Sequence, residues 1–184
     1  MKIPNRTELN EDFLTQQAHT IGMHMMTAAE TAPTGRGRNT LKMCLLQKEE
    51  KDNIAKEMIR MAENGHPQFF FRDAENILQA HALLIMGSSI DPLGLPNCKF
   101  CGFDSCEEKN TYSNTPCSFN SVDLGIALGS AVSTSALLKA DTRIMYSAGK
   151  VALLLKTLGE DVKIAFGIPI SISSKSPFFD RKSS

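Results

Sequence analysis

Four cysteines lie close together in the chain, and they limit what it can fold into more than any other feature. These four clustered cysteines follow the pattern C-x2-C-x4-C-x10-C and are Cys98, Cys101, Cys106 and Cys117. The stretch around them, about 87–117, is rich in turn-forming residues and has no apolar periodicity. A loop of this length without secondary structure of its own usually has a function. We therefore expect a bound inorganic group to supply the order that side-chain packing does not.

The cysteine spacing fits a [4Fe–4S] cluster better than a zinc ion. Iron–sulfur clusters are held by Cys thiolates, often by a close group and one more distant ligand. Structural zinc sites usually show two short pairs, as in C-x2-C…C-x2-C, whereas the later intervals here are four and ten residues. Zinc on the same four residues remains an alternative. A further alternative is that the four cysteines bind no metal and that some of them form disulfides. This is disfavoured in a cytosolic chain, because the cytosol keeps thiols reduced.

The residues around the clustered cysteines suit an anionic cluster. Pro116 and Cys117 directly precede a predicted helix, and unpaired N–H groups at the start of a helix favour negative charge. Three aromatic residues are expected to shield the cluster from water: Phe100, Phe103 and Phe119. The fifth cysteine, Cys44, lies in the apolar segment LKMCLL and is predicted to be an inert buried thiol.

Charge and hydropathy point to a cytoplasmic protein. The chain has 184 residues, with 20 Lys and Arg balancing 20 Asp and Glu, so no basic excess favours nucleic acid or an anionic membrane surface. The apolar runs are far shorter than the roughly 20 residues that span a bilayer. We expect a single domain over 1–184, with an iron–sulfur loop at about 87–117 and neither a nucleic-acid nor a membrane partner.

Apolar periodicity predicts an α+β protein. Residues spaced three and four apart predict helices at about 10–32, 48–64, 69–80, 121–138 and 143–158. Alternating or continuous apolar residues predict strands at about 41–45, 82–86 and 162–172.

The segment TAPTGRGRN, residues 31–39, is a candidate anion site. Its glycines expose backbone N–H groups, and its polar side chains add donors that suit phosphate. The donors that we assign to this tentative anion or flavin loop are Arg36, Arg38 and Asn39. A plain loop that ends the first helix is the alternative, since the segment has neither a Walker lysine pattern nor G-x-G-x-x-G.

Most of the chain after residue 30 resembles a group of bacterial and archaeal proteins described as containing a ferredoxin domain. The similar stretches are TAPTGRGRN, FFFRDAENI, CKFCGFDSC, VDLGIALGSAV, RIMYSAGKVA and GIPISISSKSPFFDR. The cysteine segment is also similar to the [4Fe–4S] segment of the corrinoid iron–sulfur protein of the acetyl-CoA pathway. This resemblance implies that all four clustered cysteines are cluster ligands.

The order of elements resembles, more loosely, the flavin-dependent nitroreductases. The turn Ala32-Pro33-Thr34 running to Asn39 and the late Gly167-Ile168-Pro169 follow their order. The resemblance implies an α+β sheet-and-helix core, a homodimer and FMN at the dimer interface. Two features depart from that family: its Arg-rich start is missing, and its Gln-Pro-Trp after the Asn is replaced by Thr40-Leu41-Lys42.

Three hypotheses follow for the function. The favoured one is a redox protein that transfers one electron at a time through its [4Fe–4S] cluster. The second is a nitroreductase-type enzyme in which the cluster feeds electrons to FMN bound near residues 33–39; the two departures argue against FMN there. The third is a zinc site that only stabilises the loop. In the expected homodimer the helix at 121–138, with Gly125 and Gly129 four residues apart, is the candidate interface.

Overall fold

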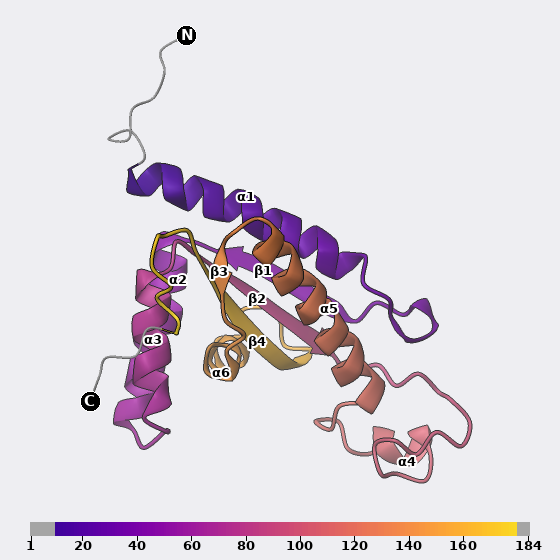
Figure 1. The fold of residues 1–184 in the computed structure, drawn as a ribbon. Helices are drawn as coiled ribbons and strands as arrows, with labels where there is room; N and C mark the ends of the chain where they lie inside the picture. Colours follow the sequence, from indigo (N-terminus) through magenta and orange to yellow (C-terminus); the bar gives the residue numbers. More distant parts are fainter. Residues whose placement is uncertain (1–9, 180–184) are drawn as a thin grey trace.

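A four-stranded antiparallel sheet forms the centre of the computed structural model, which describes residues 10–179. The strand order is β1-β2-β4-β3. Helices cover both faces of the sheet: α1 and α5 lie on one face, and α2, α3 and α6 lie on the other (Figure 1). The strands are β1 (Leu41–Leu46), β2 (Ala82–Ser89), β3 (Asp141–Thr142) and β4 (Val162–Ser171). The helices are α1 (Glu11–Glu30), α2 (Lys48–Glu63), α3 (Phe69–Gln79), α4 (Cys106–Asn110), α5 (Ser118–Leu137) and α6 (Tyr146–Leu154).

The central strand β2 divides the hydrophobic core into two halves. Its side chains alternate between the two faces of the sheet, as the pleat requires. Leu83 and Ile85 pack with α2, α3 and α6, whereas Ala82, Leu84 and Met86 pack with α1 and α5. All five are fully buried, which explains the continuous apolar run that the sequence shows here.

Local capping explains where several helices begin and end. Asn10 accepts a hydrogen bond from the Phe13 N–H through its side chain and so caps the start of α1. The last carbonyl groups of α3 accept hydrogen bonds from a different helix. The buried Lys51 ammonium of α2 donates to the carbonyl oxygens of Ile77 and Leu78 at 2.9 and 3.3 Å. A cation placed there also favours the negative end of the α3 dipole.

The α+β prediction and most of the expected elements are confirmed, but one helix is shorter than expected. The helix expected at 143–158 is α6, which covers only Tyr146–Leu154. Met145 exchanges two backbone hydrogen bonds with Gly167 of β4, at 2.8 and 3.0 Å, so the chain is still extended there. The sequence did not predict β3 or α4. They have two and five residues, which is too short for a periodic pattern of apolar residues to show. Within residues 10–179 no helix is long and apolar enough to cross a bilayer.

Helix α6 packs so closely on β4 that one of its residues must be glycine. A Cβ atom on Gly149 would lie only 1.9 Å from the backbone carbonyl oxygen of Ala165. Backbone atoms of a central strand cannot move away without disturbing the sheet, so the clash would persist.

We expect Gly149→Ala to lower the free energy of unfolding by about 1–3 kcal/mol or more, because overpacking forces the backbone apart. Urea denaturation followed by circular dichroism measures the change. Lys150→Ala, at the exposed neighbouring position of the same helix, is the control and should change stability by no more than about 0.5 kcal/mol. Equal unfolding midpoints for the two variants would contradict this account of the packing.

Cys44 lies in β1 and is half-buried. Burial, and then the negative charge of Glu50, raise the pKa of its thiol from the ordinary 9.0 to about 11. Its thiolate, which is the reactive form, is therefore scarce at neutral pH. This setting supports the inert role that the sequence predicts.

We expect iodoacetamide at pH 8 to modify Cys44 at least about tenfold more slowly in the folded chain than in urea, since the raised pKa removes thiolate. In the folded chain the rate should keep rising above pH 9, because the thiol titrates only near pH 11. Mass spectrometry of the labelled peptide gives both rates. Equal rates in the folded and unfolded chain would show that burial does not protect the thiol.

Candidate functional site

The clustered cysteines lie together in one long loop at an end of the sheet. This cysteine loop, residues 90–117, leaves β2 after Ser89 and enters α5 at Ser118, and it extends away from the body of the molecule around α4 (Figure 1). All four cysteines line one cavity of about 340 Å³. They are unpaired thiols, with Cys117 buried and the other three half-buried. The structure thus brings together the four residues that the spacing singled out.

The backbone of the cysteine loop turns tightly around the first two cysteines. Asn97 and Lys99 adopt left-handed conformations, with φ of 58° and 51°, and Gly102 follows with φ of 85°. The Gly102 N–H donates to the Lys99 carbonyl oxygen at 3.0 Å. Open space surrounds the position where a Gly102 Cβ would lie, so glycine is favoured here by backbone conformation and not by crowding.

The two later cysteines lie at the starts of helices. Cys106 is the first residue of α4, which Ser105 caps by accepting a hydrogen bond from the Glu108 N–H at 3.1 Å. Cys117 occupies the capping position of the 20-residue helix α5, and its thiol makes no capping hydrogen bond. The unpaired N–H groups of α5 therefore lie beside a cysteine that lines the cavity, as the sequence predicts.

The clustered cysteines surround the cavity without meeting at one point. Among residues 10–179 no three Cys, His, Asp or Glu side chains are grouped closely enough to hold a single metal ion. A four-iron cluster has a different requirement, because each thiolate binds its own iron and the four sulfurs stand apart around the inorganic core. The cavity is thus lined by four thiol donors, which is the number and type of ligand that iron–sulfur clusters take.

Aromatic residues cover part of this cavity. Phe119 stacks on Phe100, with ring centroids 5.7 Å apart and planes 13° apart, and Phe103 packs on Tyr112 at 5.1 Å. The three predicted shielding residues, Phe100, Phe103 and Phe119, all line the cavity. Phe100 is nevertheless 74% exposed, so one face of this aromatic pair is open to solvent.

The predicted anion loop holds the cysteine loop in place. Arg36 donates to the Leu93 carbonyl oxygen at 3.1 Å, and Arg38 donates to the Pro92 carbonyl oxygen at 2.9 Å. Arg38 also forms an ion pair with Asp91 at 3.3 Å. These donors come from the 3-10 turn Gly35–Gly37 and the residue after it, which follow α1.

Helix α5 also holds the start of the cysteine loop, near residues 91–93. The Asn120 side chain accepts from the Asp91 N–H and donates to the Asp91 carbonyl oxygen, both at 3.0 Å. Asp123 accepts from the Gly35 N–H at 3.0 Å and so joins α5 to the arginine turn. We call these contacts the loop clamp; its side chains are Arg36, Arg38, Asn120 and Asp123. Asn39, the third predicted anion donor, instead donates to Glu30 at 2.7 Å and accepts from the Leu41 N–H.

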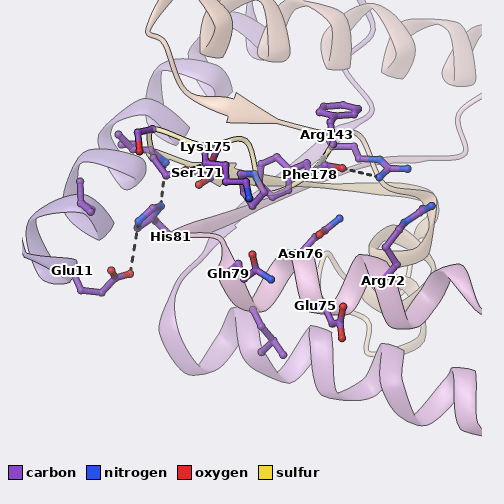
Figure 2. Close-up of a pocket in the computed structure, with 17 residues that line it drawn as sticks. Glu11, Arg72, Glu75, Asn76, Gln79, His81, Arg143, Ser171, Lys175 and Phe178 are labelled. Carbon is purple, nitrogen blue, oxygen red and sulfur yellow. Dashed lines mark hydrogen bonds and ion pairs between the residues drawn. The ribbon is translucent and has the colours of Figure 1, made fainter. Parts of the chain in front are cut away.

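The structure also shows a larger cavity that the sequence did not suggest. It has a volume of about 1390 Å³ and lies at the other end of β2, near the start of α1 (Figure 2). Its lining comes from segments far apart in the chain, and none of Arg36, Arg38 and Asn39 contributes to it. The sequence signal for this cavity was weak because each segment supplies only a few ordinary polar residues.

Comparison with known proteins finds a family that matches part of the chain and a relative that matches nearly all of it. Residues 113–181, which include Cys117 but not the other clustered cysteines, match a family described as "Uncharacterized protein containing a ferredoxin domain (DUF2148)". A protein from Archaeoglobus fulgidus, described as "Uncharacterized protein", is 40% identical over 181 residues. That alignment covers 94% of this chain and 97% of the relative.

Solved structures with the same fold are nitroreductase-like proteins. Nitroreductase CinD from Lactococcus lactis, in complex with nicotinic acid, gives a TM-score of 0.58 at 14% identity, covering 90% of this chain and 83% of that one. A nitroreductase family protein from Clostridium novyi NT gives a TM-score of 0.56 at 12% identity, and the match covers 97% of this chain and 79% of that one. An oxidoreductase containing FMN gives 0.54 at 14% identity, covering 85% and 67%.

At these identities the solved structures establish the fold alone, and the expected nitroreductase-like core is confirmed. The matched family model and the near full-length archaeal relative agree with the resemblance that the sequence motifs carry. The chain therefore belongs to the family of proteins described as containing a ferredoxin domain, and it is built on the nitroreductase fold.

Proposed function

We propose that this protein is an iron–sulfur redox protein in which the four clustered cysteines hold one [4Fe–4S] cluster that transfers one electron at a time. The observation that carries the proposal is the single cavity that all four thiols line. Membership of a family described by a ferredoxin domain supports an iron–sulfur redox role at a coarser level. The cluster type and the electron transfer are the parts that we add.

The size of the cavity favours a cluster over zinc. Its volume of about 340 Å³ is roughly ten times the share of one water molecule in the liquid, about 30 Å³. A tetrahedral zinc site needs four ligand atoms within about 2.3 Å of one point and leaves no such space. The four thiols that line this space match the number and type of ligands that a four-iron core takes.

The residues around the cavity would stabilise an anionic cluster. Cys117 precedes the free N–H groups of α5, where the helix dipole favours negative charge. Lys99 also lines the cavity and is a cation there, although it forms an ion pair with Asp104 at 2.7 Å. Phe103 and Phe119 exclude water from one side. The exposed Phe100 ring would be the contact for an electron-transfer partner.

An FMN-dependent oxidoreductase remains the second candidate. The fold likeness to an oxidoreductase containing FMN favours it. The predicted flavin donors Arg36, Arg38 and Asn39 are engaged in hydrogen bonds within the chain, so a phosphate in that loop would have to displace the loop clamp. We therefore prefer the electron carrier and place the structural zinc site third.

Replacing any one clustered cysteine by Ala should remove most of the bound iron, because a four-iron cluster needs all four thiolates. Cys44→Ala is the matched control and should keep the iron content of the native chain, since Cys44 lies in β1, outside this cavity. The measurement is iron and sulfide analysis of anaerobically purified protein, together with its absorbance. Native iron content in two of the four loop variants would rule out this ligand assignment. A colourless protein with one zinc would support the third candidate instead.

We also propose a homodimer that forms through the outer face of α5. Val122, Ile126 and Leu137 are 54%, 40% and 79% exposed on this helix, and no charged residue lies between Leu124 and Leu138. Gly125 and Gly129 are exposed on the same helix, with open space where a Cβ would project. Two copies can therefore approach closely without like-charge repulsion, and a second copy is the occupant that we assign to this face.

We expect the native chain to be a dimer at micromolar concentration, and Ile126→Glu to make it a monomer because a charge would be buried at the contact. Light scattering gives the molar mass. Leu154→Glu, at a 53% exposed position of α6 on the opposite face of the sheet, is the control and should leave the dimer intact. If the native chain is a monomer, the dimer proposal is wrong, and the assignment of the cluster ligands is unaffected.

A further inference from the structure

We propose that Asn120 is a positioning residue for the cluster: it holds Cys117, the last of the clustered cysteines, in place relative to the other three. This inference rests on the proposed function, because it concerns the ligands of the [4Fe–4S] cluster. Asn120 is itself no ligand and is not among the residues that line the cavity. It acts through the backbone at the two ends of the cysteine loop.

The side-chain amide of Asn120 pairs with the backbone of Asp91 in both directions. Oδ1 accepts from the Asp91 N–H and Nδ2 donates to the Asp91 carbonyl oxygen, both at 3.0 Å. This exchange of two hydrogen bonds imitates the pairing of neighbouring antiparallel strands. It needs a donor and an acceptor side by side, which an ionised Asp or a Leu of similar size does not offer. Asn120 is only 1% exposed, so water does not compete for the contact.

The contact closes the cysteine loop at its base. Asp91 is the second residue after β2, and Asn120 is the third residue of α5, 29 residues further along the chain. Figure 1 shows the chain leaving β2, passing around α4 and returning to the start of α5. Bringing the ends of a long loop together costs conformational entropy. Because the Asn120 contact has already closed the loop, binding of a cluster has less freedom to remove.

The clustered cysteines fall into two groups according to the backbone that carries them. Cys98, Cys101 and Cys106 follow one another closely within the loop, whereas ten residues separate Cys106 from Cys117. Cys117 lies at the start of α5, so its place relative to the first three depends on what joins α5 to the loop. Asn120 supplies such a contact from the first turn of this helix.

Neighbouring contacts act in the same place. Phe119, directly before Asn120, stacks on Phe100, which lies between the first two clustered cysteines. Leu93, two residues after Asp91, is 3% exposed, lines the cavity and has its carbonyl oxygen held by Arg36 at 3.1 Å. The backbone that Asn120 fixes therefore leads directly into the wall of the cavity.

This arrangement predicts which ligand is affected when Asn120 is lost. Helix α5 has 20 residues and keeps its own backbone hydrogen bonds without the Asn120 side chain. The first three clustered cysteines also keep their places in the loop. Only the placement of Cys117 is loosened, so the expected change is loss of the one iron that this thiolate would hold.

The test compares the native full-length chain with Asn120→Ala, both purified anaerobically. Each is treated with ferricyanide, a one-electron oxidant, in the presence of a chelator for the released iron. Removal of one electron and one Fe²⁺ from [4Fe–4S]²⁺ leaves [3Fe–4S]⁺, which electron paramagnetic resonance detects. We expect the variant to release this iron at least about tenfold faster than the native chain, because two hydrogen bonds to a buried amide are lost. A general loss of structure would instead release all four irons together.

The matched control is Asn114→Ala, which removes an exposed asparagine of the same loop and should leave the release rate unchanged. A second measurement keeps the test decisive if Asn120→Ala folds poorly. In the native chain stripped of iron, the Asp91 amide should exchange its hydrogen at least about tenfold more slowly than in the unfolded chain, since Asn120 binds it without the cluster.

The outcomes separate this inference from the proposed function. Equal release rates for the native chain and Asn120→Ala, release of all four irons together from the variant, or an unprotected Asp91 amide would overturn the role of Asn120 alone. A native chain that holds no iron would overturn the proposed function and, with it, this inference.

Discussion

Burial of β2 on both faces is the constraint on which the rest of the structure depends. A strand whose residues are all apolar from Ala82 to Met86 can be removed from water only if the sheet is covered on both sides. Helices α1 and α5 cover one side, and α2, α3 and α6 cover the other. This arrangement requires close helix-to-strand contact, which Gly149 provides against β4. The cysteine loop follows the end of β2 at Ser89, and the larger cavity lies near the start of β2, beside His81.

The cysteine loop depends on the rest of the chain for its position. It contributes little to either hydrophobic core, so the contacts at its base have a large share in placing it. The loop clamp brings donors from Arg36 and Arg38, far earlier in the chain, onto the carbonyl oxygens of residues 92 and 93. Asn120 and Asp123 tie the same base to α5. A cluster bound by the four thiols would then order the outer part of the loop, in the way that metal binding commonly supplies folding free energy.

The two candidate sites differ in how they are built. The cysteine loop offers soft sulfur ligands in one continuous stretch of sequence. The larger cavity is assembled from helix ends, a connection and the segment after β4, and neighbouring groups hold its two arginines in position. Asp73 and Ser147 orient Arg72, and the backbone of Phe178 orients Arg143. Orientation of this kind lowers the conformational entropy that a ligand would have to remove on binding.

The sequence by itself determined the elements and the candidate ligands, because both depend on local patterns. Periodic apolar residues predicted α1, α2, α3 and α5 within a few residues, and the spacing of the clustered cysteines singled out four residues that the structure places around one cavity. Only the tertiary structure decided the role of the TAPTGRGRN arginines, since Arg36 meets a carbonyl oxygen 57 residues away. It also revealed the larger cavity, whose lining comes from four separate segments. Contacts across such separations are set by how the helices pack on the sheet, and no local pattern of residues records that packing.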